Sequence, residues 1–343
     1  MRIRSSLGDY RVCFLPNALA DLSNDPGDLV FLTDERFAAM LPADRAVSMP
    51  ATEGRKSLGE VERISAAMRA MGANRGTTLV GVGGGIVQDV GSFVASIYMR
   101  GIAWRFVPTT LLAMVDSCIG GKSAVNVGGL KNLLGTVHPP RDVLIDPAFC
   151  KTLEAEQIVG GLCEAAKVCF AMSPRRFDRY LALRPDEPLD ENRLAAIIGL
   201  SLVSKKWFVE HDEFDRGERL KLNFGHTFAH AIEDASDFAV PHGVAVGMGM
   251  RVAIETARRL GTATGTRTHL LGTHIAKMLG GLPSPAAIDV DRMMESFVSD
   301  KKHSRDSLTL ILPDQDDRLA IRRLPRDVET AALIRACVER VLA

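Results

Sequence analysis

The stretch TLVGVGGGIVQD (residues 78–89) decides the fold class of this chain of 343 residues. Its first part, Thr78–Val82, is apolar and rich in β-branched residues, as expected for a buried strand. Three glycines follow directly, Gly83, Gly84 and Gly85, and an amphipathic stretch over 86–99 then predicts a helix. A strand, a glycine turn and a helix in this order indicate an α/β fold with a parallel sheet.

The glycine turn is also a candidate nucleotide-binding site. Glycines between a strand and a helix allow the backbone to approach a pyrophosphate, and the helix N-terminus offers N–H groups to its charge. The spacing is not that of a complete GxGxxG motif, so a tight turn without a ligand is the alternative. Asp34, after the strand LVFLT (29–33), suits either a ribose contact or a helix N-cap, and Glu53 and Lys56 are equally open.

The sequence pattern changes near residue 150. Residues 1–150 alternate short strands with helices, whereas residues 151–343 have long helical periodicities broken by glycine and proline. We therefore expect an α/β N-terminal domain over 1–150 and a mostly α-helical C-terminal domain over 151–343. Helices are expected over 155–171, 173–184, 189–211, 221–236 and 243–260, with a hairpin over 308–313 and 319–325 before a final helix.

The composition argues against several classes of partner. Hydrophobic residues make up 46% of the chain and charged residues 24%, and 42 basic residues balance 42 acidic ones. A net charge of zero gives no footprint for nucleic acid or for an anionic membrane surface. The six cysteines have no CxxC pairing and no apolar run approaches the roughly 20 residues of a membrane span, so a cytoplasmic protein with reduced thiols is expected.

A histidine-rich segment gives the strongest local signal for chemistry. In NFGHTFAHAIE (223–233), His226 and His230 lie four residues apart on one helical face, as two metal ligands or as a ligand and a neighbouring base. His242 opens the next predicted helix, and Glu164 in GGLCEAAK (160–167) has Lys167 one turn later. Two imidazoles and a carboxylate indicate a catalytic zinc site, and capping or interior histidines are the alternative.

Several polar side chains occur in unusually apolar or glycine-rich surroundings. They are Arg100, Asp116, Lys122 and the pair Lys131–Asn132. Lysine and arginine bind phosphate and carboxylate groups through charge-assisted hydrogen bonds, so together they favour an anionic substrate. Each one alone is as well explained by an exposed surface position.

Ordered motifs along the chain carry a family resemblance. They are GGGIVQD, YMRG, VPTTLLAMVDS, GGKSAVN, KNLLGTVHPP, GGLCEAAK, DEFDRGERLKLNFGHTFAH and HGVAV. Through them the chain resembles 3-dehydroquinate synthases and the wider sugar phosphate cyclases, from about residue 28 to about residue 313. The resemblance implies a cytoplasmic homodimer with an N-terminal NAD-binding domain and a helical domain that binds metal and substrate.

The resemblance also implies a role for individual residues. A divalent metal, zinc or cobalt, would be held by Glu164, His226 and His242. NAD would contact Asp34, Glu53, Lys56, Gly83, Gly84, Gly85, Asp89, Thr109 and Thr110. The substrate would be bound by Arg100, Asn132, Lys205, Arg219 and one of Lys301 or Lys302. Catalytic roles would fall to Asp116, Lys122, Lys131, Lys167, Asn223 and His230.

The implied reaction converts 3-deoxy-D-arabino-heptulosonate 7-phosphate to 3-dehydroquinate, with phosphate elimination and no net consumption of NAD. Lys205 and Arg219 favour an acid substrate, because a neutral sugar phosphate has no carboxylate to bind. Val244, Gln88 and Ala229 depart from the usual family motifs, so a related cyclase of secondary metabolism is an alternative. A metal-dependent alcohol or glycerol phosphate dehydrogenase and an inactive binding protein are further alternatives.

Overall fold

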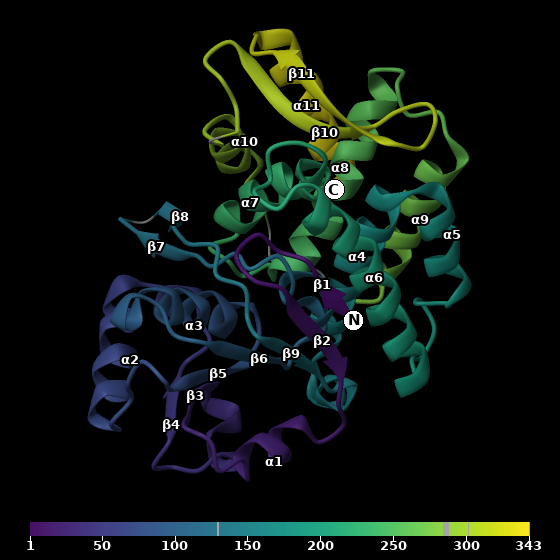
Figure 1. The fold of residues 1–343 in the computed structure, drawn as a ribbon. Coiled ribbons are helices and arrows are strands. Elements are labelled where there is room, and N and C mark those ends of the chain that lie inside the picture. The colour runs from purple at the N-terminus through teal and green to yellow at the C-terminus, as the bar shows by residue number, and fades with distance from the viewer. Residues whose placement is uncertain (129, 284–287, 301, 343) are drawn as a thin grey trace. The chain divides into compact units, whose positions relative to one another are not determined.

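The chain forms two compact units, Met1–Leu153 and Glu154–Ala343. The computed structural model, drawn in Figure 1, describes residues 1–128, 130–283, 288–300 and 302–342. Each unit has its own architecture and is described by itself.

Unit 1 is built on a seven-stranded sheet in the order β1-β2-β9-β6-β5-β3-β4. The strands are β1 (Arg2–Ile3), β2 (Tyr10–Phe14), β3 (Leu29–Asp34), β4 (Ala46–Met49), β5 (Thr78–Gly83), β6 (Trp104–Pro108) and β9 (Asp142–Ile145). All pairings are parallel except that of β1 with β2. The predicted α/β class with a parallel sheet is therefore confirmed.

Helices cover both faces of this sheet, as Figure 1 shows for α1 (Ala18–Ser23) and α3 (Gly85–Ile97). Side chains alternate between faces along a strand, and Val80 and Val82 of β5 share a buried cluster with Leu19 of α1. The other face receives α3, where a Cβ on Gly91 would lie 3.3 Å from Leu32 of β3. A third helix, α2, spans Leu58–Ala70.

A separate two-stranded hairpin of unit 1 consists of β7 (Val125–Val127) and β8 (Leu130–Leu134). Its antiparallel register is irregular between Val125 and Val127. Three leucines of β8, Leu130, Leu133 and Leu134, are exposed. This hairpin presents the predicted Lys131–Asn132 pair.

Unit 2 is mostly helical, as predicted. Its helices are α4 (Ala155–Met172), α5 (Pro174–Ala182), α6 (Glu191–His211), α7 (His226–Ala235), α8 (His242–Arg259), α9 (Thr266–Gly280), α10 (Val290–Val298) and α11 (Val328–Leu342). The predicted hairpin is present as β10 (Ser307–Pro313) and β11 (Leu319–Pro325). Among the described residues, no helix has the length and apolarity needed to cross a bilayer.

Glycines allow α4 and α8 to approach very closely. A Cβ on Gly243 of α8 would lie 2.5 Å from the Cα of Gly160 in α4. A Cβ on Gly247, one turn further along α8, would lie 2.7 Å from Cys163 Sγ. Side chains that project from these helices can therefore meet without long reaches.

The helix predicted over 221–236 is wrong in its first part. The structure has a 3₁₀ turn over Glu218–Asn223, and α7 begins only at His226. Gly225 between them has φ 80°, and a Cβ there would lie 2.8 Å from the backbone nitrogen of Met250. A left-handed residue ends a right-handed helix, and apolar periodicity does not register such a break.

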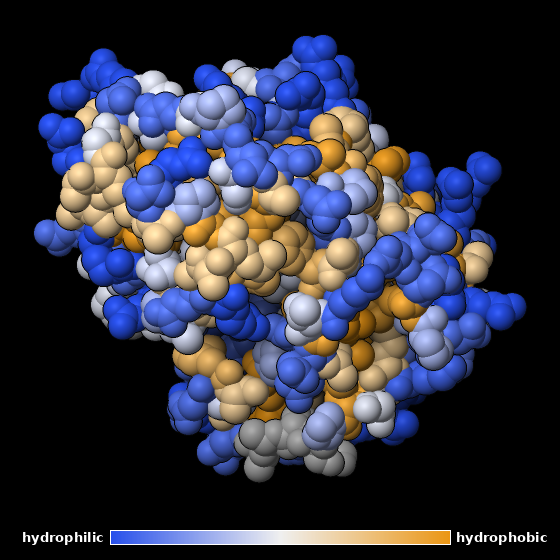
Figure 2. Space-filling model, turned by 90° about the horizontal axis from the view of Figure 1, so that it is seen from below, coloured by the Kyte–Doolittle hydropathy of each residue, from blue (hydrophilic) through white to orange (hydrophobic). Residues whose placement is uncertain are grey.

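The face of the molecule seen in Figure 2 carries hydrophilic side chains with apolar ones between them.

Candidate active site

The predicted metal ligands of unit 2 come from three different helices. Glu164 lies in the middle of α4, and His226 and His242 are the first residues of α7 and α8. One ligand atom from each lies within 4.8 Å of the others. Glu164 Oε1 is 3.7 Å from His226 Nε2 and 3.6 Å from His242 Nε2. One carboxylate and two imidazoles at this spacing form a donor set that suits zinc and leaves positions open.

The second nitrogen of each imidazole has a hydrogen-bond partner that fixes the ring. His242 Nδ1 is 3.2 Å from Glu233 Oε2, and His226 Nδ1 is 3.4 Å from the carbonyl oxygen of Phe224. Since both partners accept, each Nδ1 donates its proton to one of these oxygens, and the Nε2 of each ring faces Glu164. Sequence reasoning missed Glu233, although it follows His226 by seven residues, two turns along the same helix face.

The electrostatic surroundings of the two imidazoles differ. Burial lowers the pKa of His226 well below its ordinary value, and the charge of Lys167 lowers it further. Burial also opposes the charged form of His242, but Glu233 and Glu164 outweigh this and raise its pKa. Glu164 is 1% exposed and forms an ion pair with Lys167, one turn further along α4. A neutral His226 and an ionised carboxylate are the protonation states that metal ligation needs.

His230 lies outside this donor group, although it is one turn from His226 on α7. The two ring centroids are 5.8 Å apart, and His230 Nδ1 is 3.7 Å from Asp300 Oδ2. Asp300 also accepts a hydrogen bond of 2.8 Å from the backbone N–H of Lys302. The geometry therefore favours His226 as a ligand and His230 as its neighbour, and Asp300 is a contact that the sequence did not indicate.

The predicted carboxylate-binding pair of unit 2 is buried. Arg219, in the 3₁₀ turn before α7, is 4% exposed and Lys205 on α6 is 7% exposed. Arg219 Nη1 donates to the carbonyl oxygen of Glu213 at 2.6 Å. Asn223 Nδ2 donates to the carbonyl oxygen of Leu220 at 3.1 Å. Lys301 lies outside the described residues, and Lys302 beside it is half-buried.

The glycine turn of unit 1 has little room for side chains. A Cβ on Gly83 would lie 2.5 Å from Val87 Cγ2, and one on Gly84 would lie 2.9 Å from Thr110 Cγ2. The backbone N–H of Thr109 donates to the carbonyl oxygen of Gly83 at 2.9 Å, which ties the two loops together. Gly84 is the N-cap of α3, Gly85 is its first residue, and no described side chain caps the helix. Its first N–H groups are therefore suited to a phosphate.

Asp34 has the N-cap role that was one of its two interpretations. Its Oδ1 accepts from the backbone N–H of Arg36 at 3.1 Å, and its Oδ2 accepts from Arg36 Nη2 at 2.9 Å. The carboxylate lies at the C-terminal end of β3.

Three other cofactor candidates lie in one connected group. Lys56 Nζ is 2.5 Å from Asp89 Oδ2, and Asp89 is in the first half of α3. Glu53 Oε1 accepts a hydrogen bond of 2.8 Å from Asn126 Nδ2. Asn126, in the hairpin strand β7, is a third residue that was not singled out from the sequence, after Glu233 and Asp300.

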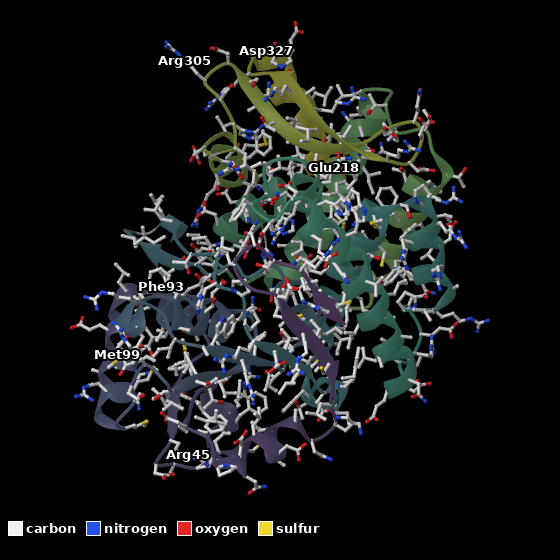
Figure 3. The ribbon with its side chains drawn as sticks, in the orientation of Figure 1. Arg45, Phe93, Met99, Glu218, Arg305 and Asp327 are labelled. Atoms are coloured by element: carbon white, nitrogen blue, oxygen red, sulfur yellow. The ribbon has the colours of Figure 1, made fainter. Side chains whose placement is uncertain are left out.

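The other catalytic and substrate-binding candidates of unit 1, Asp116, Lys122 and Arg100, lie in turns or loops of the chain. Asp116 lies in a π-helical turn over Ala113–Ser117, and Lys122 is exposed. Arg100 is exposed in the 3₁₀ turn that follows α3, where its φ is 72° and that of Met99, marked in Figure 3, is 48°. The 13 residues of α3 span about 20 Å, so the structure places Arg100 and the glycine turn at opposite ends of this helix.

The departures from the family motifs have different structural settings. Gln88 forms a reciprocal pair with Ser117, in which Nε2 donates to the carbonyl oxygen and Oε1 accepts from Oγ, both at 2.7 Å. Val244 is 6% exposed, where an ionised glutamate would need a buried partner. Ala229 is fully buried against Gly249 of α8, whose Cβ would lie 3.0 Å from the Ala229 nitrogen.

The fold and the site together define a class. An open parallel sheet with a glycine turn, followed by a helical unit that presents a carboxylate and two imidazoles, is the architecture of dehydroquinate synthase-like enzymes. Family models described as 3-dehydroquinate synthase N-terminal and C-terminal match residues 46–160 and 161–303.

Individual relatives agree with this class. The chain is 36% identical over 302 residues to a 3-dehydroquinate synthase of Dictyoglomus turgidum, covering 87% of this chain and 83% of the relative. It is 38% identical over 254 residues to a 2-deoxy-scyllo-inosose synthase of Streptoalloteichus tenebrarius, covering 74% of this chain and 66% of that protein.

A solved structure of ValA, a 2-epi-5-epi-valiolone synthase from Streptomyces hygroscopicus subsp. jinggangensis with bound NAD⁺ and Zn²⁺, superposes with a TM-score of 0.80. It is 25% identical and the match covers 98% of this chain and 99% of that one. The chain belongs to the 3-dehydroquinate synthase family and is an enzyme of the sugar phosphate cyclase type.

Proposed function

We propose that this enzyme converts 3-deoxy-D-arabino-heptulosonate 7-phosphate to 3-dehydroquinate and phosphate, with NAD and one zinc or cobalt ion as cofactors. The observation that carries the choice of an acid substrate is the burial of Lys205 and Arg219 in unit 2. Lysine and arginine bind carboxylates through charge-assisted hydrogen bonds, so two cations in the interior of unit 2 favour a substrate that carries a carboxylate. The family membership supports the reaction type.

The metal would be held by Glu164, His226 and His242. The fit rests on the donor set itself, whose three ligand atoms lie within 4.8 Å, and on the Glu233 and Phe224 oxygens that orient the imidazoles. When bound, a divalent cation lowers the pKa of a hydroxyl that coordinates to it and stabilises the resulting negative charge. Lys167 forms an ion pair with the ligand Glu164, so its amine would hold or release a proton beside the metal.

NAD would lie on the glycine turn. The uncapped N-terminus of α3 and the absence of side chains at Gly83, Gly84 and Gly85 fit a pyrophosphate. The nicotinamide, when bound, supplies a hydride acceptor that is returned to its oxidised form within the cycle. Lys56 and Asp89 would fix the cofactor from the side of α3.

The remaining polar residues would orient the sugar phosphate. His230 stands beside both ligand imidazoles, with ring centroids 5.8 Å from His226 and 6.4 Å from His242. Burial lowers the pKa of His230, although the hydrogen bond to Asp300 opposes this shift. With Nδ1 directed at the Asp300 carboxylate, the Nε2 of a neutral His230 is an acceptor that can take a proton from the substrate.

A cyclase for a neutral sugar phosphate, or for the amino analogue of the acid, is the second candidate. It is favoured by the similarity to 2-deoxy-scyllo-inosose synthase and by Val244, Gln88 and Ala229, which depart from the usual motifs. A homodimer and a cytoplasmic location stay predictions from the resemblance and the composition.

The test is phosphate release by metal-loaded enzyme with catalytic NAD, while NADH is followed by absorbance and the product is identified. We expect 3-dehydroquinate without accumulation of NADH. Release only from the amino analogue or from a neutral heptulose phosphate would replace the proposed substrate by the second candidate. Stoichiometric NADH from a simple alcohol would contradict the cyclase proposal and indicate a dehydrogenase.

A further inference from the structure

The side chain of Asn126 joins two segments of unit 1 that the proposed function assigns to different ligands. Its Nδ2 donates to Glu53 Oε1 at 2.8 Å and to the Glu53 carbonyl oxygen at 3.3 Å. Its Oδ1 accepts from the backbone N–H of Asn132 at 2.8 Å. Glu53 belongs to the candidate cofactor contacts and Asn132 to the candidate substrate contacts. The side-chain amide of Asn126 therefore forms hydrogen bonds with both segments.

The backbone of Asn126 adds a third link. Its N–H donates to the carbonyl oxygen of Lys56 at 2.7 Å, and Ser57 forms an isolated parallel bridge with it. The hairpin register is irregular between Val125 and Val127, so Asn126 is released from regular pairing with β8 and turned to segment 53–57. Lys56 in turn pairs with Asp89 of α3. The connection thus runs from α3, the helix of the glycine turn, to Asn132 in strand β8.

The segment at the far end depends on this link for its conformation. Asn132 has φ 52°, a left-handed backbone that asparagine tolerates but that still has a cost of its own. Its N–H is fixed by Asn126, while Leu130 and Leu133 around it are exposed and contribute little packing. The position of Lys131–Asn132 is therefore set by hydrogen bonding to Asn126 more than by a core.

We propose that Asn126 is a positioning residue that couples the two ligands, so that an occupied cofactor segment pre-orders Lys131–Asn132 for the sugar phosphate. The inference rests on the proposed function. A ligand that orders a shared element removes part of the ordering cost for the second ligand, and the effect is reciprocal. NAD and a phosphate group should then bind cooperatively, and this cooperativity should require the side-chain amide of Asn126.

The test compares the dissociation constant of NAD, measured by calorimetry on full-length metal-loaded enzyme, with and without saturating inorganic phosphate. In the wild type, phosphate should tighten NAD binding by about fivefold or more. Asn126→Asp keeps the acceptor for the Asn132 N–H but places an oxygen against Glu53. The ratio of the two NAD dissociation constants, without and with phosphate, measures the coupling. We expect this ratio to fall to near one in Asn126→Asp.

Two further variants distinguish a loss of coupling between the ligands from a general loss of structure in the hairpin. Glu53→Gln in the Asn126→Asp background reverses donor and acceptor between the two side chains, and it should restore the ratio. Thr136→Val removes the hydroxyl contacts of Thr136 with Ser123 (2.8 Å) and Ser96 (2.9 Å) at the base of the same hairpin, away from Glu53, and should also keep the ratio. Thermal unfolding confirms that each variant is folded.

Three results would overturn the inference. They are a wild-type enzyme whose NAD affinity is unchanged by phosphate, an Asn126→Asp variant that keeps the wild-type ratio, and a double variant in which the ratio stays near one. A wild-type enzyme that binds no NAD would overturn the proposed function itself and this inference with it.

Discussion

The glycine turn of unit 1, proposed to hold NAD, and the metal-ligand group of unit 2, proposed to consist of Glu164, His226 and His242, are constructed in opposite ways. At Gly83–Gly85 the backbone makes the proposed site, and Val87 and Thr110 leave no space for a Cβ at Gly83 and Gly84. At the metal-ligand group three side chains make the site, and glycines elsewhere on the helices let them converge. A substitution that adds a side chain should therefore disrupt the glycine turn, and one that removes a side chain should disrupt the metal-ligand group.

Glu164→Ala should have the largest effect. It removes the carboxylate 3.7 and 3.6 Å from the two imidazoles and leaves Lys167 buried without its partner. We expect bound metal to be lost and turnover to fall by roughly three orders of magnitude or more. Metal content by atomic absorption and phosphate release measure this, with Glu329→Ala at the exposed start of α11 as control. Full metal content and full activity in Glu164→Ala would refute the assigned group.

Gly84→Val should weaken NAD binding at the glycine turn and leave metal binding unchanged. Gly84 has φ −84°, which any residue adopts, so the cost arises from the contact of 2.9 Å with Thr110 and from blocked access to the α3 N-terminus. We expect NAD binding to weaken by about 100-fold, since a clash at a phosphate-binding backbone is not easily relieved.

Gly59→Ala on α2 is the matched control for Gly84→Val, because a Cβ there meets only Ser57 Oγ at 4.0 Å. Calorimetry of NAD binding distinguishes the two variants. Equal NAD affinity in Gly84→Val and in the control would show that the turn does not hold the cofactor.

Glu233 tests whether the metal-ligand group depends on a residue that is not itself a ligand. Glu233→Ala should weaken zinc binding towards 100-fold and Glu233→Gln by about tenfold, because glutamine keeps an acceptor for His242 Nδ1 but loses the charge. Zinc affinity by competition with a chromogenic chelator is the measurement. Zinc affinity equal to wild type in both variants would exclude the orienting role.

Glu255, on α8 but away from the ligands, gives the smallest expected effect and a pH signature. Hydrogen bonding to Arg258 outweighs burial and, with Arg259 and the charge of Arg340, lowers the pKa of Glu255 to about 2 from 4.5. A depressed folded-state pKa stabilises the fold above the unfolded value and is lost as pH falls towards 2. Glu255→Gln should thus cost on the order of 1 kcal/mol near about pH 7 and nothing below about pH 2.

Urea unfolding across this pH range tests the Glu255 prediction, with wild type and variant compared at each pH. A difference that does not shrink with acidity would show that the ion pairs with Arg258 and Arg259 do not account for the stability.

Much of the fold followed from pattern, for identifiable reasons. Thr78–Gly85 combines a buried strand with consecutive glycines, and few structures other than a strand-to-helix turn accommodate both. The helical periodicity of 155–171 and 243–260 was equally plain, and α4 and α8 agree with it closely. The break at Gly225 escaped because one left-handed residue leaves the apolar spacing on either side unchanged.

For the site, sequence alone determined which residue types were present at usable spacing: a helix with His226 and His230, a second with His242 and a third with Glu164. The family resemblance implied the set Glu164, His226 and His242, and the tertiary structure brings one ligand atom of each within 4.8 Å of the others, where Gly160 and Gly243 let α4 and α8 approach closely. Glu233 and Asn126 likewise acquired a role only through their hydrogen bonds to His242 and to Glu53 and Asn132. A linear pattern records what each residue can do, whereas the partner it meets depends on packing between segments distant in the chain.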